Sequence, residues 1–135
     1  MLWCGLTYSA HPLACAAGLA TIAVYEEDGL IENAAQLGLY LGECLEDLKA
    51  RHPSVGDARY IGLFSALEMV KDRSSKEPSP VMGEIGQFLR ANGLFTFIFG
   101  NILFIVPPLC ITQSQLDEGL VIIDKALAIG DKVCA

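Results

Sequence analysis

The chain has 135 residues, of which 53% are hydrophobic and 19% are charged, and its formal net charge is −7. This length is typical of one domain, and the acidic balance excludes the nucleic-acid-binding classes of protein, which need a basic face. No apolar run approaches the roughly 20 residues of a transmembrane helix, and no basic stretch with a cleavage site predicts a signal peptide.

The chain opens on a polar turn that leads through a proline into an apolar helix. Pro12 suits the first turn of a helix, because its missing N–H has no intrahelical partner there. Residues 13–25 are apolar or small on every side, which is typical of a helix buried all round. We therefore expect this helix to lie between two layers of protein and to end at the acidic stretch 26–29.

A long amphipathic helix is predicted from Leu30 onward. Its apolar stripe is formed by Leu30, Ala34, Leu37, Leu41, Cys44 and Leu48. Steps of four and three residues place these side chains on one helical face, and the short stripe favours packing on a sheet over a coiled coil. His52 and Pro53 are expected to end the helix, with His52 exposed to solvent.

Strands and turns dominate the middle of the chain. Two strands are expected at 58–61 and 63–70, where aromatic and β-branched residues gather around glycines. The stretch 71–80 is rich in charge, serine and proline and predicts a surface loop. A short helix over 81–89 follows, and Asn92-Gly93 is typical of its left-handed C-terminal cap.

The remaining elements are a hairpin and a helix. Gly100-Asn101 lies between apolar runs at 94–99 and 102–106 and predicts a hairpin. Thr112 and Gln115 predict a capping box at the start of the last helix. The residues that suggest a second apolar face on the sheet are Phe97, Phe99, Leu103 and Ile105. The order of elements predicts an α+β fold, with two long N-terminal helices and a C-terminal helix packed on a small antiparallel sheet.

The five cysteines are scattered, with no CxxC pair and no nearby histidine: Cys4, Cys15, Cys44, Cys110 and Cys134. A metal site or a disulfide framework needs closer spacing. We therefore expect no metal and reduced thiols that pack as small hydrophobic side chains, in a cytoplasmic protein.

Five segments resemble, in order, landmarks of the class III aminotransferases, which use pyridoxal 5'-phosphate (PLP). In the opening turn, Thr7, Tyr8, Ser9, Ala10, His11 and Pro12 fill the family's pattern of threonine, aromatic, two small residues, Asn or His, and proline. The other segments are 25–34, 55–63, 92–94 and 106–112. Together they span nearly the whole chain, which therefore resembles the C-terminal portion of such an enzyme.

The resemblance implies a fold-type-I enzyme with two parts in this chain. Residues 1–29 would carry the phosphate-contacting turn and the helix that leaves the large domain, and residues 30–135 would form the C-terminal small domain. In the family, the Leu6 amide and Thr7 contact the phosphate of the cofactor held in the other subunit of a homodimer. The implied reaction moves an amino group from an amine or omega-amino acid to a keto acid such as pyruvate.

No catalytic residue is expected in these 135 residues. The family's catalytic lysine and the aspartate on the pyridine nitrogen precede the segment that Thr7 marks. The lysines present lie in charged loops or on polar helix faces: Lys49, Lys71, Lys76, Lys125 and Lys132. None has the apolar surroundings that lower the pKa of a reactive lysine. We therefore expect this chain alone to be inactive.

Two departures from the family pattern bear on the substrate. Tyr60 stands where relatives usually have glycine, and the hairpin lacks the arginine with which many relatives bind a substrate carboxylate. The hairpin carries Phe97, Phe99 and Phe104 instead, which cannot replace a bidentate guanidinium. We interpret them as an apolar pocket wall for an amine or omega-amino donor. The alternative is that all three are core residues.

Other functions remain open from the sequence. An aminomutase or decarboxylase of the same family would share this domain. From a different class, the chain would be a stand-alone module that dimerises through its apolar helix, or a small-ligand-binding α+β domain without PLP.

Overall fold

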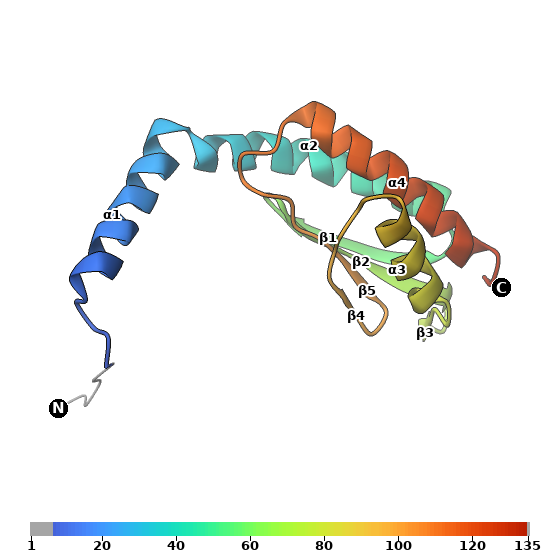
Figure 1. Ribbon diagram of the computed structural model, residues 1–135. Coiled ribbons are helices and arrows are strands. Elements are labelled where there is room, and N and C mark those ends of the chain that lie inside the picture. The colour runs from blue at the N-terminus through green and yellow to red at the C-terminus, as the bar shows by residue number, and fades with distance from the viewer. Residues whose placement is uncertain (1–6, 135) are drawn as a thin grey trace.

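The computed structural model describes residues 7–134 and has helices on one face of a small sheet (Figure 1). The helices are α1 (Pro12–Glu27), α2 (Leu30–Arg51), α3 (Met82–Ala91) and α4 (Gln113–Asp131). The strands are β1 (Val55–Ile61), β2 (Phe64–Asp72), β3 (Glu77–Pro78), β4 (Ile98–Phe99) and β5 (Ile102–Ile105). The predicted α+β fold and the order of its elements are confirmed, with β3 as an addition.

The sheet is antiparallel throughout, in the order β1-β2-β5-β4, and β3 pairs separately with β2. Its register places Ala58, Leu67 and Leu103 in one row across three strands. This row faces the helices and is buried, as is Ile105. The expected apolar second face is therefore wrong for Leu103 and Ile105, because alternate residues of β5 point to opposite faces.

The long helix α2 approaches the sheet closely at two glycines. A Cβ placed on Gly38 would lie 2.6 Å from the carbonyl carbon of Gly62, in the turn between β1 and β2. A Cβ on Gly42 would lie 2.6 Å from Cζ of Tyr60. The tyrosine that departs from the family pattern thus fills the space that Gly42 leaves open on α2.

Three local signals predicted from the sequence are confirmed. Gly93 and Gly100 have φ values of +83° and +58°, the left-handed conformations that a helix cap and a tight hairpin turn require. Thr112 accepts a hydrogen bond from the Gln115 amide, and the Gln115 side chain accepts one from the Thr112 amide, which completes the capping box.

The predicted loop over 71–80 is a hairpin in the structure. Strand β2 continues to Asp72, which pairs with Glu77 of β3. The Asp72 carboxylate accepts hydrogen bonds from the Ser74 amide and from the hydroxyls of Ser74 and Ser75. These bonds, the Ser74 amide first, lower the pKa of Asp72 to about 2. The polar residues of this stretch, which predicted a loop, therefore form the tight turn between β2 and β3.

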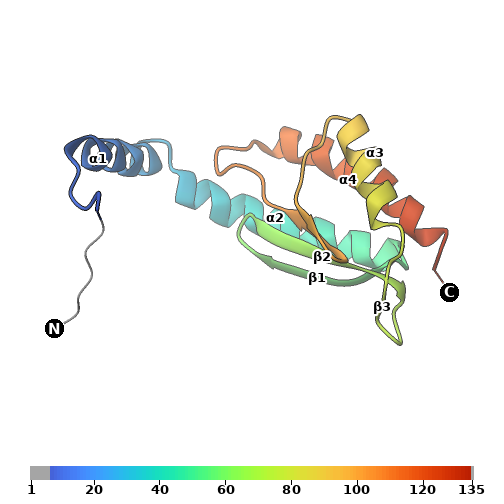
Figure 2. The same ribbon diagram turned by 60° about the horizontal axis from the view of Figure 1, so that its bottom comes forward.

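Helix α1 is apolar as predicted, but its predicted burial is wrong in this chain. None of its residues is buried, and its main contacts are with α2. Figures 1 and 2 show the helix projecting away from the sheet and the other helices. The prediction assumed a second layer of protein, and the described residues do not supply one. No helix within residues 7–134 is both long and apolar enough to cross a membrane.

Candidate functional site

The turn before α1, residues 7–10, is exposed to solvent. Thr7 is exposed in this turn, and the His11 amide donates to the Tyr8 carbonyl at 3.2 Å. Ala10 adopts a left-handed conformation with φ of +57°, which turns the chain into the helix. Leu6, the other residue expected to contact phosphate, lies outside the described residues.

The start of α1 fits an anion. His11 is the N-cap residue but makes no side-chain capping bond, and the first turn of the helix contains no acidic residue. The amides of Leu13 and Ala14 lack intrahelical acceptors because they lie in the first turn. These donors and the positive end of the helix dipole suit a phosphate group.

A cluster of phenylalanines covers the sheet face opposite the helices. The rings of Phe97 and Phe104 have centroids 5.5 Å apart, those of Phe64 and Phe104 6.1 Å, and those of Phe97 and Phe99 6.4 Å. Phe97 is 62% exposed, Phe99 is 70% exposed, and Phe104 is half-buried. The alternative that all three predicted residues are core is therefore wrong within this chain.

Phe64 belongs to this cluster but was not singled out from the sequence. Phe64 directly opposes Ile61 across the tight β1–β2 turn, while Ala66 opposes Phe104 on the next strand. Alternate residues of β2 therefore place Phe64 on the same face as Phe104. Only the pairing of β2 with β5 reveals this, since the two strands are distant in the sequence.

An apolar cavity of about 300 Å³ lies between the hairpin segment and α4. Its lining includes Phe97, Phe104, Leu116 and Leu120, whereas Phe99 lies outside it. Thr96 shapes the wall, because its hydroxyl donates to the Phe104 carbonyl while the Phe104 amide donates to the Phe97 carbonyl at 3.0 Å. No lysine or arginine lines the cavity within the described residues.

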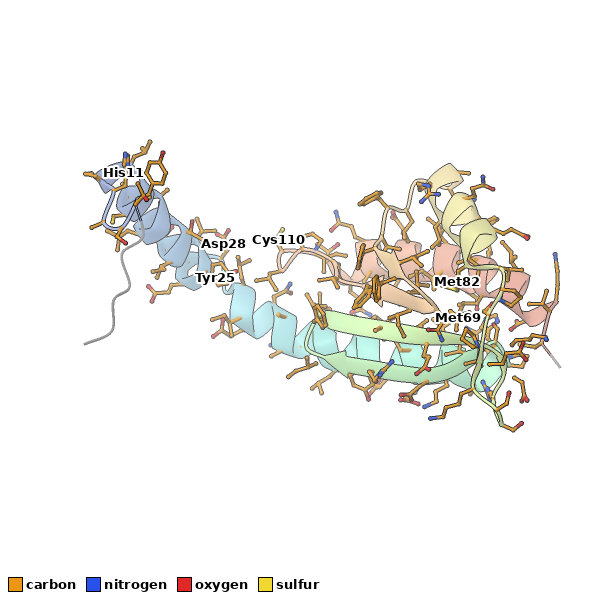
Figure 3. The ribbon with its side chains drawn as sticks, turned by 90° about the horizontal axis from the view of Figure 1, so that it is seen from below. His11, Tyr25, Asp28, Met69, Met82 and Cys110 are labelled. Carbon is orange, nitrogen blue, oxygen red and sulfur yellow. The ribbon has the colours of Figure 1, made fainter. Side chains whose placement is uncertain are left out.

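The structure does not bring the two predicted sites together within one chain. Thr7 precedes the projecting α1, whereas the phenylalanine cluster lies on the sheet (Figures 1 and 2). Figure 3 shows the same separation, with His11 at the outer end of α1 and Met69 and Met82 in the body. A site that uses both features therefore has to draw them from different copies of the chain or from additional protein.

The lysines have ordinary surroundings. Lys49 pairs with Asp57 at 3.1 Å, and Lys71 pairs with Glu77 at 3.1 Å. Lys76, Lys125 and Lys132 are exposed, so no lysine among residues 7–134 is buried. Cys15, Cys44, Cys110 and Cys134 are unpaired.

His52 is not the solvent-exposed helix end that the sequence suggested. Its side chain is 9% exposed, with Nδ1 2.6 Å from an Asp131 oxygen and Nε2 3.0 Å from an Asp124 oxygen. Asp131 also accepts hydrogen bonds from the amide and the hydroxyl of Ser54. Both aspartates belong to α4, so the network joins the C-terminal ends of α2 and α4. The His-Pro pattern showed the helix end but not the partners, which lie more than seventy residues away.

Residues 3–127 match the family model described as Aminotransferase class-III. Among similar proteins, the ethanolamine-phosphate phospho-lyase homolog 1 of Caenorhabditis elegans is 34% identical over 91% of this chain and 27% of its own length. The probable 4-aminobutyrate aminotransferase of Bacillus subtilis is 37% identical over 91% of this chain and 29% of its own length.

Solved structures are similar over almost the whole chain. The taurine:2-oxoglutarate aminotransferase from Bifidobacterium kashiwanohense, in complex with PLP and glutamate, superposes with a TM-score of 0.89 and 40% identity, over 98% of this chain and 31% of that one. The chain thus spans less than a third of the length of these proteins.

Proposed function

This chain belongs to the class III aminotransferase family, and from that premise we propose that it supplies the phosphate-contacting turn and the small domain of a PLP-dependent aminotransferase. The proposed enzyme is a cytoplasmic homodimer with shared active sites. It moves an amino group from an amine or omega-amino acid to a keto acid such as pyruvate. The observation that carries the proposal is the exposed donor turn at Thr7, which precedes an uncapped helix start in a chain of this family.

We divide the chain at the junction between α1 and α2. Residues 1–29 form the turn and the helix that connects to a large domain, and residues 30–135 form the small domain. The projection of α1 from the remaining elements supports this division, because an apolar helix without a covering layer needs further protein against it.

In the proposed enzyme, Thr7 and the Leu6 amide of one subunit hold the phosphate of the cofactor that serves the partner subunit. The Thr7 hydroxyl would donate to the phosphate, and the amides at the start of α1 would add partial positive charge. When bound, PLP supplies the electron-withdrawing ring system on which amino-group transfer depends. The role of this chain is to hold and orient that group, while the catalytic lysine comes from additional protein.

Phe97, Phe99 and Phe104 form an apolar wall for the amino donor. Their rings contact one another on an exposed sheet face, and two of them line the cavity beside α4. Apolar surface favours a donor whose chain carries no charge near this wall. The absence of a guanidinium among the described lining residues disfavours a carboxylate at the same place.

Replacing Thr7 with alanine tests the phosphate contact. We expect the Kd for PLP of the full-length protein encoded at this locus to rise about tenfold, because a charge-assisted hydrogen bond of about 1.4 kcal/mol is lost. The measurement is a titration followed by cofactor absorbance. Ser9→Ala, in the same turn, is the matched control and should leave the Kd unchanged. Equal Kd values for both variants would remove Thr7 from the site.

Replacing Phe104 with arginine tests the apolar wall. We expect kcat/KM for donors that carry a carboxylate to rise about tenfold relative to simple amines, because the guanidinium offers a bidentate partner. Phe104→Leu keeps the wall apolar and should retain the original preference. An unchanged preference in Phe104→Arg would show that this position does not face the donor.

A different reaction of the same family is the second candidate, which the phospho-lyase homolog among the relatives favours. Aminomutases and decarboxylases also remain compatible with this domain. Formation of alanine from pyruvate, measured with a panel of amines, separates amino transfer from these reactions. A stand-alone interaction module predicts instead that the chain is monodisperse by itself and that the locus encodes no catalytic domain.

A further inference from the structure

We propose that Asn33 is a positioning residue of the enzyme. It holds the loop 106–112, which follows the phenylalanine wall, in a fixed place relative to the arm, residues 7–29, which carries Thr7. This inference rests on the proposed function, because it links the two features assigned there to cofactor and donor. It concerns a residue on α2 that contacts neither of them.

The contact itself is specific. The Asn33 side-chain nitrogen donates to the Leu109 carbonyl at 2.7 Å and to the Ile111 carbonyl at 3.0 Å. A side-chain amide has two N–H donors, so both hydrogens are used on one loop. Asn33 is half-buried, and the two carbonyls belong to a turn closed by the Ile111 amide, which donates to the Pro108 carbonyl at 3.0 Å. The side chain therefore holds a preformed turn at two points.

The loop depends on this contact more than an ordinary loop would. Pro107 and Pro108 have no amide hydrogen and therefore cannot donate a backbone hydrogen bond to the sheet or to a helix. Within residues 7–134, no other side chain donates to the Leu109 or Ile111 carbonyl. The loop also connects the wall to α4, because Phe104 lies on β5 just before it and Thr112 caps α4 just after it.

Asn33 itself lies close to the arm that carries the phosphate-contacting turn. It lies in the first turn of α2, where its backbone amide donates to the carbonyl of Gly29 at 3.0 Å. Gly29, with a φ of +60°, forms the joint with α1. Figure 3 shows Cys110, at the tip of the loop, near the α1–α2 joint with Asp28 and Tyr25. Asp28, Asn33 and Cys110 also line one groove. Asn33 thus lies where the arm leaves the domain and sets its position against the loop.

Substitution with aspartate is the sharpest test, because it keeps the size of the side chain and removes its donors. At neutral pH the carboxylate of Asn33→Asp accepts only, so it faces two carbonyl oxygens without a hydrogen bond. Asn33→Ala removes the contact without this repulsion. Gln36→Glu is the control, since it makes the same amide-to-acid change at an exposed position on the same helix.

The first readout is amide hydrogen exchange over residues 106–112 of the 135-residue chain. We expect exchange at Ile111 to accelerate about tenfold in Asn33→Asp, somewhat less in Asn33→Ala, and not at all in Gln36→Glu. Unchanged exchange in both Asn33 variants would overturn the proposal, because the loop would then be held by other contacts.

The second readout is steady-state kinetics of the full-length protein encoded at this locus. We expect the KM of the amine donor to rise about tenfold in Asn33→Asp with a smaller change in kcat, because the wall is displaced from the cofactor. A variant that loses only thermal stability and folded protein, with an unchanged KM, would make Asn33 a structural residue and overturn the proposal. A wild-type protein without transaminase activity overturns the proposed function instead, and the exchange result still shows whether Asn33 holds the loop.

Discussion

Replacing Gly38 with alanine is expected to destabilise the domain by about 2 kcal/mol. The new Cβ would lie 2.6 Å from the carbonyl carbon and 2.8 Å from the carbonyl oxygen of Gly62, so α2 has to move away from the sheet. Overpacking of this kind costs up to about 3 kcal/mol, and the better helix propensity of alanine returns about 1 kcal/mol. Because the obstacle is backbone, no rotamer change can relieve it.

Urea unfolding followed by circular dichroism measures this effect as a lower midpoint with an unchanged slope. Gly83→Ala is the matched control, because a Cβ there has nothing within 4 Å and the site also lies on a helix. Its midpoint should stay within the equivalent of about 1 kcal/mol. Equal midpoints for the two variants would mean that α2 does not approach the β1–β2 turn as closely as described.

The second large effect is expected at Asp131, where we predict that alanine costs about 2 kcal/mol at neutral pH. The substitution removes the acceptor for His52 Nδ1 and for the amide and hydroxyl of Ser54, which is fully buried. Leaving buried donors without their acceptor costs about 1–3 kcal/mol. Asp47→Ala is the control: that carboxylate forms an exposed pair with Arg51 and should contribute well under 1 kcal/mol. Equal losses in the two variants, measured by urea unfolding, would contradict the prediction.

The same network predicts how stability depends on pH. The hydrogen bond from His52 lowers the pKa of Asp124. Burial alone would raise the pKa of Asp131, but the hydrogen bonds from Ser54 and His52 outweigh it and lower the pKa. Both aspartates therefore have a lower pKa in the folded state than the value of about 3.9 in the unfolded state. Their contribution to stability is complete above about pH 3.9, and it is lost as the pH falls through the folded pKa values. Asp131→Ala should therefore show a flatter acid limb than the wild type, and an equally steep limb would contradict this assignment.

Much of the fold could be predicted because its signals are local. The capping box of Thr112 and Gln115 spans one helical turn, and the glycines at 93 and 100 mark turns whatever surrounds them. The sequence-based predictions of burial were wrong where a segment distant in the sequence determines whether a side chain is buried. His52 is buried because Asp124 and Asp131 reach it from α4, and nothing near Pro53 in the sequence indicates that.

Less of the candidate site than of the fold could be predicted from the sequence. Thr7 and the three hairpin phenylalanines were proposed from resemblance and from the missing arginine, and their roles stay predictions. The structure adds Phe64 and the cavity beside α4, both of which depend on strand pairing. Asn33 lay in a recognisable segment without an assigned role, because its two acceptors are 76 and 78 positions away. Hydrogen bonds of that reach leave no spacing pattern in a single sequence.

The position of β2 inside the sheet has a consequence for the order of folding. Within the order β1-β2-β5-β4, β1 joins β2 through a tight turn at Gly62, whereas β5 is separated from β2 by β3, α3 and β4. Closing the longer loop costs more chain entropy, so the β1–β2 hairpin with α2 is expected to form early and β5 to dock late. During synthesis on a ribosome, the edge of β2 that pairs with β5 lacks this partner until Ile105 has been synthesised. Chaperones that shield apolar strands would act in that interval.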